Sequence, residues 1–205
     1  MKRSCVTWGM SNPRHRFQDE AGYILHTSAW RETSLICHAF TRNHGLVPMV
    51  AKGAKRPHSI LRPALSVFQP LLLAWSGKNE VKTLTRADCA GIRPLKGRAL
   101  MSAWYMNELL IRLLPREDPH PVLYDAYEEA LVHLAQVPRP PVAGALRRFE
   151  WVLLTETGYG FDEATPDFDD PVGEPELRIR LRERLNSLLG RPLHTRSVLM
   201  QLQRY

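Results

Sequence analysis

Residues Thr33 to Asn79 organise the rest of the chain, and their centre reads Val50-Ala51-Lys52-Gly53-Ala54-Lys55-Arg56. In this centre an apolar strand end passes into a glycine turn that carries three cations. The whole stretch contains no Asp or Glu, whereas its basic residues are Arg42, Lys52, Lys55, Arg56, Arg62 and Lys78. Apolar strands that alternate with acid-free basic loops are typical of a surface that lies against a polyanion. We therefore expect a nucleic-acid backbone as the partner of this stretch.

Short strands are predicted on both sides of this centre. Runs of apolar and β-branched residues, bounded by turn residues, predict strands over 22–27, 34–41, 46–51, 67–75 and 80–85. Pro48 restricts the third strand to an edge or a bulge, and Pro70 interrupts the fourth. A basic loop from Lys52 to Arg62 separates these two strands. Five short strands are typical of a small Greek-key barrel, either an OB-fold or an SH3-like barrel, and strand counting alone does not separate the two.

The second half of the chain is predicted to be helical. Apolar residues recur at helical spacing over 98–114, 118–135, 142–157, 177–189 and 196–203. Asp118 and Pro119 suit the N-cap and the first helical position of the second helix. The Leu and Arg alternation over 177–181 also fits a strand, but Gly190 and Pro192 end the segment as they commonly end a helix. The sequence thus predicts an α+β protein in which a five-stranded barrel precedes a helical bundle.

The charge is divided between the two halves. Through Lys96 the chain has 15 Lys and Arg against 5 Asp and Glu, and from Gly97 onward it has 13 against 16. This division predicts a basic binding domain at 19–90 and a helical domain at 91–205. The polar and basic residues 1–18 are expected to form a flexible lead-in. Residues 161–176 hold seven acids, three prolines and no base, which indicates an exposed linker. Met10 offers an alternative translation start to Met1.

Several classes of protein do not fit this sequence. Cys5, Cys37 and Cys89 are scattered and form no Cys-x-x-Cys pair, which indicates reduced thiols rather than a disulfide framework or a zinc knuckle. No apolar run approaches the roughly 20 residues that cross a bilayer, and residues 1–18 lack the apolar core of a signal peptide. We expect a cytoplasmic, nucleoid-associated protein without a membrane partner.

Common catalytic motifs are also missing from the sequence. It contains no phosphate-binding G-x-x-x-x-G-K-[ST], no G-x-G-x-x-G, no H-E-x-x-H and no G-x-S-x-G. The eight histidines are isolated, and no two of them are spaced to bind one metal ion. We therefore predict no catalytic residue, no metal and no cofactor, and we do not expect an enzyme.

Seven short motifs follow one another along the chain. They are Trp30-Arg31-Glu32-Thr33-Ser34-Leu35, Val50-Ala51-Lys52-Gly53-Ala54-Lys55-Arg56, Phe68-Gln69-Pro70-Leu71-Leu72-Leu73, Glu80-Val81-Lys82-Thr83-Leu84, Tyr105-Met106-Asn107-Glu108-Leu109, Ala145-Leu146-Arg147-Arg148-Phe149-Glu150 and Gly158-Tyr159-Gly160-Phe161. Their order over Trp30 to Phe161 resembles that of the bacterial recombination mediator family RecO. The run from Gly190 to Ser197 also resembles the C-terminal helix junction of that family.

The resemblance implies an N-terminal OB-fold on an α-helical domain, without ATPase or nuclease activity. RecO-like proteins bind single- and double-stranded DNA, anneal complementary strands, and bind the acidic C-terminal tail of single-stranded DNA-binding protein (SSB). With RecR, and at some junctions RecF, they help load RecA on SSB-coated gaps. Some members hold zinc through four cysteines after the Gly-Tyr-Gly-Phe motif, but residues 161–176 contain none, so no metal is expected.

Two sites are expected. Basic side chains of the first half would neutralise DNA phosphates and release counterions; they are Arg42, Lys52, Lys55, Arg56 and Arg62. Phe40, Phe68 and Trp75 are available for stacking on bases, but their places in apolar strands favour the core.

The second expected site is a receptor for the SSB tail. Its acidic residues and apolar end need an apolar pocket rimmed by cations. We expect Arg147 and Arg148 to form it against Leu109, Leu113 or Tyr124. One alternative is that both arginines pair with Glu150 or Glu156 or are solvated. Another is that basic residues from Arg178 to Arg184 form the receptor, or else the solvated face of a helix.

Other functions remain open at this point. A small-barrel factor in transcription or translation would prefer RNA and ignore the SSB tail. An assembly scaffold would bind acidic protein rather than oligonucleotides. A nuclease ranks last, because Mg²⁺ needs clustered carboxylates and the central basic stretch has none.

Overall fold

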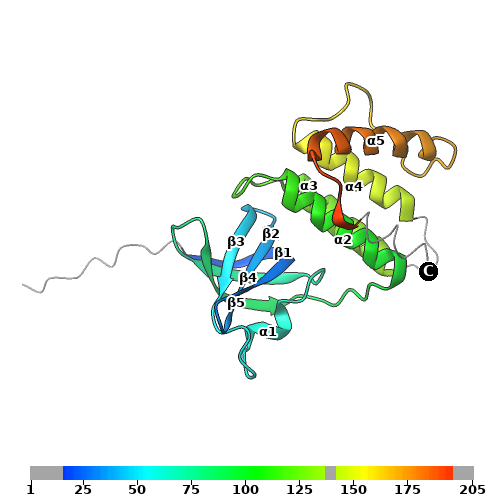
Figure 1. The fold of residues 1–205 in the computed structure, drawn as a ribbon. Coiled ribbons are helices and arrows are strands. Elements are labelled where there is room, and N and C mark those ends of the chain that lie inside the picture. The colour runs from blue at the N-terminus through cyan, green and yellow to red at the C-terminus, as the bar shows by residue number, and fades with distance from the viewer. Residues whose placement is uncertain (1–15, 137–141, 196–205) are drawn as a thin grey trace, which may run out of the picture.

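The N-terminal half forms a closed β-barrel, and the C-terminal half packs a group of helices against one side of it (Figure 1). The computed structural model describes residues 16–136 and 142–195. The strands are β1 (Arg16–Trp30), β2 (Ser34–Thr41), β3 (Gly45–Ala51), β4 (Leu71–Ser76) and β5 (Lys82–Cys89). The helices are α1 (Leu61–Ala64), α2 (Gly97–Leu113), α3 (Pro121–Gln136), α4 (Val142–Glu156) and α5 (Glu174–Leu189). The predicted α+β class is confirmed.

The strand order identifies the barrel as an OB-fold. Neighbouring strands follow the order β1-β2-β3-β5-β4, and β1 closes the barrel by pairing with both β2 and β4. Only the β3–β5 pair is parallel among these five pairs. Strand β1 is long enough to pair with both β2 and β4. Its register shifts between Phe17 and Glu20 in the pair with β4, and between Ile24 and His26 in the pair with β2. The OB-fold is therefore confirmed over the SH3-like alternative.

Strand β1 is buried on both faces near its middle. Ile24 points into the barrel with Val47, Leu73 and Trp75, whereas Tyr23 and Leu25 join the core beneath the helices. This division follows the two-residue period of a strand. A continuous apolar run is therefore expected here, because the helices cover the outer face.

Several predicted boundaries move in the structure. Strand β1 starts at Arg16, inside the range expected to be a flexible lead-in, because Arg16 and Phe17 pair with Ser76 and Trp75 of β4. Strand β4 starts only after Pro70, and β5 continues to Cys89 rather than ending at residue 85. These boundaries depend on partners distant in sequence, which a local pattern does not reveal.

The start of α3 is a clear correction. This helix begins at Pro121 and not at the Asp118-Pro119 pair. The segment before it lies against the β2–β3 turn, where a Cβ on Gly45 would come within 1.9 Å of the Asp118 carbonyl oxygen. Gly45 has φ +63°, so glycine suits this position for two reasons.

Helix α5 confirms the helical reading of residues 177–189, although it starts earlier, at Glu174. Gly190 ends it in the left-handed conformation at φ +60°. The predicted helix at 196–203 lies outside the described residues. The acidic segment that precedes α5 packs on α4 through Phe161, whose ring stacks on Trp151 with centroids 5.3 Å apart.

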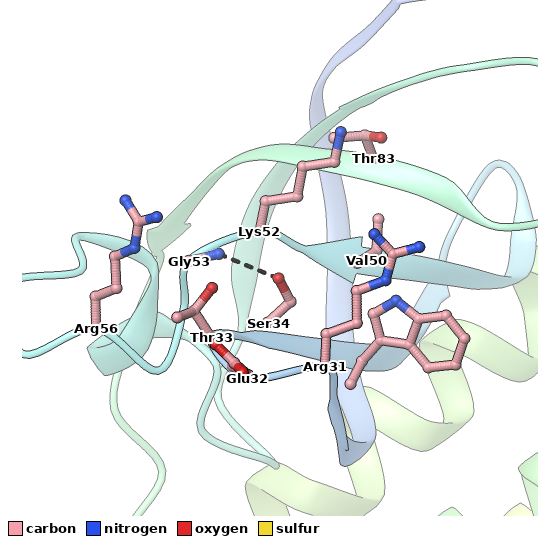
Figure 2. A pocket seen from close by; sticks show the side chains of 10 residues that line it. Arg31, Glu32, Thr33, Ser34, Val50, Lys52, Gly53, Arg56 and Thr83 are labelled. Carbon is pink, nitrogen blue, oxygen red and sulfur yellow. Dashed lines mark hydrogen bonds between the residues drawn. The ribbon is translucent and has the colours of Figure 1, made fainter.

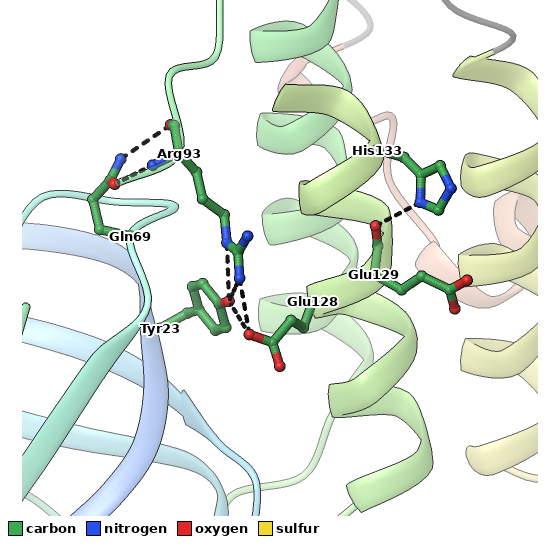
Figure 3. Close-up of polar contacts among 6 residues, drawn as sticks. All are labelled: Tyr23, Gln69, Arg93, Glu128, Glu129 and His133. Carbon is green, nitrogen blue, oxygen red and sulfur yellow. Dashed lines mark hydrogen bonds and ion pairs between the residues drawn. The ribbon is translucent and has the colours of Figure 1, made fainter. Parts of the chain in front are cut away.

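Polar contacts fasten the barrel to the helices. Asn107 donates from Nδ2 to the Leu25 carbonyl at 2.8 Å and accepts at Oδ1 from the Tyr127 hydroxyl at 2.6 Å. Arg93, on the connection between the two halves, donates to both the Tyr23 hydroxyl and Glu128 (Figure 3). One continuous hydrophobic core contains residues of both halves. The barrel and the helices thus form one body.

None of the helices in residues 16–136 and 142–195 combines the length and apolar character needed to cross a bilayer.

Candidate nucleic-acid interface

The basic centre of the sequence forms a tight turn after β3. Gly53 takes φ +70°, and its carbonyl accepts a hydrogen bond of 3.0 Å from the Arg56 amide. Two further hydrogen bonds anchor the turn to the β1–β2 hairpin. The Lys55 amide donates to the Thr33 carbonyl at 2.9 Å. The Gly53 amide donates to Ser34 Oγ at 3.4 Å (Figure 2). The cations of the turn therefore project from a fixed backbone.

An open hollow of about 870 Å³ lies between this turn and the hairpin. We call it the barrel hollow; it is lined by Trp30, Arg31, Glu32, Thr33, Ser34, Val50, Lys52, Gly53, Arg56 and Thr83. A second hollow of about 820 Å³ shares Lys52, Gly53 and Arg56 and extends along α1 and β5. The basic turn thus stands between two depressions, which gives a long ligand a path past the same cations.

The side chains of the cations on the turn and on α1 have no ion-pair partner among residues 16–136 and 142–195. Lys52, Lys55, Arg56 and Arg62 are exposed, and none forms an ion pair with any residue in the described ranges. An unpaired surface cation keeps its full charge for an incoming anion. This arrangement supports binding to a phosphate backbone.

Arg42 stands apart from the other four predicted DNA-binding residues. It lies beyond the opposite end of β3, a strand of seven residues that spans about 23 Å at about 3.3 Å per residue. Its Nε and Nη2 atoms each bond an oxygen of Asp125 at 2.9 Å, which ties the barrel to α3. The hydrogen bond from Arg42 lowers the pKa of Asp125, and the same bond raises the pKa of Arg42. Its charge is thus already matched within the fold.

The aromatic residues divide as the sequence indicates. Phe40, Phe68 and Trp75 are all buried, as their apolar strands favour. The exposed aromatic residue at the barrel hollow is instead Trp30, which is 45% exposed. The local sequence pattern did not mark Trp30 as an exposed residue of the site, although its position between two predicted strands indicates a hairpin.

The five residues predicted to bind the SSB tail do not meet in one pocket. Leu109 is fully buried in the core, and Tyr124 packs against Tyr23 and Phe40 at the junction with the barrel. Leu113 is only partly buried. Arg148 pairs with Glu129 at 3.2 Å and lies over the Phe168 ring. Arg147 does not lie with these residues but lines a separate depression.

Arg147 lines a different depression of about 460 Å³ between α2, α4 and α5. We call it the helical hollow; it is lined by Arg98, Met101, Ser102, Tyr105, Leu146, Arg147, Glu150, Arg178, Arg182, Leu185, Asn186, Leu193 and Thr195. Four arginines thus surround apolar side chains. Such a site can receive a carboxylate together with an apolar group.

Helical spacing explains why only half of the α5 arginines reach this hollow. Residues four apart lie on one side of a helix, whereas residues two apart lie on nearly opposite sides. Arg178 and Arg182 therefore face the helical hollow, while Arg180 and Arg184 lie over the Phe161 ring at 4.9 and 5.0 Å.

A buried carboxyl lies at the floor of the helical hollow. Glu150 is 2% exposed, and its Oε2 lies 3.3 Å from Nε of Arg147. Its Oε1 accepts a hydrogen bond of 2.7 Å from the Tyr105 hydroxyl. Burial raises the pKa of Glu150, and the Arg147 charge opposes that rise.

Within the residues that the structure describes, no three His, Cys, Asp or Glu side chains are grouped to hold a metal ion.

Comparison with known proteins assigns both halves of the chain. A family profile described as "Recombination protein O N terminal" matches residues 16–93, and one described as "Recombination protein O C terminal" matches residues 95–165. The chain is 54% identical over 173 residues to the DNA repair protein RecO of Aromatoleum aromaticum, covering 83% of this chain and 71% of that protein. It is 55% identical over 175 residues to the Ralstonia nicotianae RecO, covering 81% and 63%. For Cupriavidus metallidurans RecO the identity is 48% over 174 residues, covering 80% and 58%. The chain thus spans 58–71% of the length of these relatives.

Proposed function

The chain belongs to the recombination protein O family of DNA repair proteins, and from that premise we propose that it binds DNA and anneals complementary strands. The observation that carries this proposal is a group of exposed cations that form no ion pair within the described residues. Lys52 and Arg56 line the barrel hollow, Lys55 lies in the same turn, and Arg62 lies on α1. Contacts with phosphates release counterions and do not read bases, so binding is tolerant of sequence and strongly dependent on salt.

Annealing follows from the same charges. Two single strands repel each other through their phosphates, and a cationic surface that holds both lowers this repulsion. The open shape of the barrel hollow and its neighbour allows a strand to enter and leave without a lid. The protein then acts by bringing strands together, and we propose no catalytic step of its own.

The helical hollow is the better receptor for the SSB tail. The tail chemistry, acidic residues with an apolar end, matches four arginines around Leu146, Leu185 and Leu193. Leu109, Leu113 and Tyr124 do not take part, since they lie in the core or at the barrel junction. Arg147 remains in the proposed receptor, joined by Arg178 and Arg182, which the sequence offered as the alternative.

The family resemblance also supports a wider role. Binding the SSB tail would bring this protein to coated gaps, where annealing and exchange of SSB are needed. We propose that it works there with RecR, and at some junctions with RecF, so that RecA is loaded. A cytoplasmic location close to the nucleoid fits this role.

The test is annealing of complementary oligonucleotides precoated with the cognate SSB. Wild type should anneal these strands, and a folded Lys52/Lys55/Arg56→Ala variant should not. Circular dichroism establishes that the variant is folded. A matched control replaces Arg180 and Arg184 with Ala, because these residues lie over Phe161 and away from both proposed sites.

Two other outcomes of these binding tests would favour a different function. If wild type fails to anneal coated strands yet binds bare RNA, the barrel serves an RNA-binding factor. If only acidic proteins bind and oligonucleotides do not compete, the basic surface belongs to an assembly scaffold.

A further inference from the structure

Trp30 is unusual among the tryptophans that the structure describes. Trp75 is 1% exposed inside the barrel, Trp104 packs against Phe68, and Trp151 stacks on Phe161. Trp30, in contrast, is 45% exposed and makes no ring-to-ring contact with any residue in 16–136 or 142–195. An indole left in water forgoes a large amount of apolar burial, so its ring is available to a ligand.

The backbone around Trp30 holds this ring in place. Trp30 is the last residue of β1 and pairs with Ser34 across a three-residue turn. The same turn is bonded to the basic turn after β3 through the Thr33 carbonyl and the Ser34 hydroxyl. The ring is therefore carried by a hairpin that is fixed relative to Lys52 and Arg56.

The charges around the ring define its ligand. The guanidinium carbon of Arg31 lies 5.9 Å from the centroid of the Trp30 ring, in cation–π contact. Arg31, Lys52 and Arg56 line the barrel hollow against one acid, Glu32 (Figure 2). Apart from Trp30, Val50 is the one apolar side chain in the lining of the barrel hollow. An apolar peptide would therefore have little surface to pack against. An anionic ligand with a flat π face fits this setting best.

We propose that Trp30, supported by Arg31, is the stacking platform for an unpaired base, while Lys52 and Arg56 hold the flanking phosphates. This inference rests on the proposed DNA binding and adds a preference to it. Bases in a duplex are already stacked on their neighbours, whereas bases of a single strand can stack on an exposed ring. The barrel hollow thus favours single-stranded over double-stranded DNA through Trp30, and its cations bind both.

The experiment measures binding of a thymine oligonucleotide and of a duplex of equal length at one fixed salt concentration. The variants are Trp30→Ala, Trp30→Phe and, as a matched exposed aromatic away from the hollow, Tyr159→Ala. A third probe has the same sugar-phosphate backbone but an abasic tract in its centre. Loss of one stacked base is expected to weaken single-strand binding by roughly 5- to 160-fold.

The proposal expects this loss for Trp30→Ala on the thymine strand, with duplex affinity within about twofold of wild type. Trp30→Phe should keep most of the affinity, Tyr159→Ala should keep all of it, and the abasic probe should bind wild type and Trp30→Ala alike. Equal single-strand affinity for wild type and Trp30→Ala would overturn the proposal. An equal loss on strand and duplex would also overturn it, since Trp30 would then only support the hairpin. If wild type binds no DNA at all, the proposed function itself fails.

Discussion

The barrel hollow and the helical hollow both gather cations, but they surround them with different neighbours. In the barrel hollow the cations stand exposed on a turn, with Glu32 as the one acid in the lining. In the helical hollow four arginines surround leucines and a buried glutamate, Glu150. The first arrangement suits a long polyanion of any sequence, and the second suits a single acidic end with an apolar side chain. Cation count alone therefore does not define a ligand; the neighbours of the cations do.

If the two hollows bind different ligands, variants of one hollow should affect only the ligand of that hollow. We expect Lys52/Lys55/Arg56→Ala to lower the affinity for duplex DNA about 500-fold at 0.1 M salt, since each phosphate contact with B-form DNA is worth about eightfold there relative to 1 M salt. The slope of log affinity against log salt should fall by about 2.7. Arg178/Arg182→Ala should leave both quantities unchanged. Fluorescence anisotropy across a salt series gives both, and a parallel loss in the two variants would show that the hollows act as one site.

The reverse exchange uses an acidic peptide with an apolar C-terminal residue. Arg178/Arg182→Ala should weaken its binding roughly 10- to 100-fold, because charge-assisted hydrogen bonds are lost. Arg180/Arg184→Ala is the matched control, being the same change on the opposite side of α5. Titration calorimetry separates the two variants. Equal affinities would remove the helical hollow as the receptor.

The buried carboxyl of Glu150 in the helical hollow should make the stability of the protein depend on pH. Its pKa is raised in the fold, because burial disfavours the charged form more than Arg147 favours it. A raised carboxyl pKa stabilises the protein fully below the unfolded value, near 4.5, and this contribution is lost as pH rises through the folded value. Wild type should therefore lose stability relative to Glu150→Gln over that interval, by about 1.4 kcal/mol for each unit of the rise.

Urea unfolding of both proteins between pH 4 and 8 checks this effect. Gln keeps an oxygen that accepts from the Tyr105 hydroxyl, so the variant differs mainly in charge. A difference in unfolding free energy that stays constant with pH would contradict the raised pKa.

The smallest expected effect contrasts two arginines beside the same hollow. Arg56 and Arg86 both line the depression along α1 and β5, but Arg86 pairs with Asp19 and Asp88 whereas Arg56 pairs with no described residue. Arg56→Ala should lower DNA affinity about eightfold at 0.1 M salt. Arg86→Ala should lower it by less than about twofold, because its charge is already compensated. The anisotropy assay resolves this difference, and equal losses would show that intramolecular pairing does not limit phosphate binding.

The local pattern of the sequence was enough to predict the barrel, most of its strands and the four long helices within the described residues. The local pattern did not predict the boundaries that are set by contacts with residues distant in sequence. Arg16 and Phe17 become strand only by pairing with β4, and Asp118 gives up a helix cap because it lies against Gly45. The same limit applies to the sites. Lys52, Lys55 and Arg56 are neighbours in sequence and lie in one turn of the structure. Arg42, in contrast, forms an ion pair with Asp125 of α3, and Arg147 shares the helical hollow with Arg178 and Arg182 of α5.

The contacts between barrel and helices have a consequence for how the two hollows work together. Asn107, Arg93 and the Arg42–Asp125 pair join the two halves at three places, which restricts movement of one hollow relative to the other. A ligand captured at one hollow then presents whatever it carries within a limited distance of the other. Binding at the second hollow becomes an intramolecular event, with an effective concentration that is set by the length of the captured tail rather than by how much DNA is in solution.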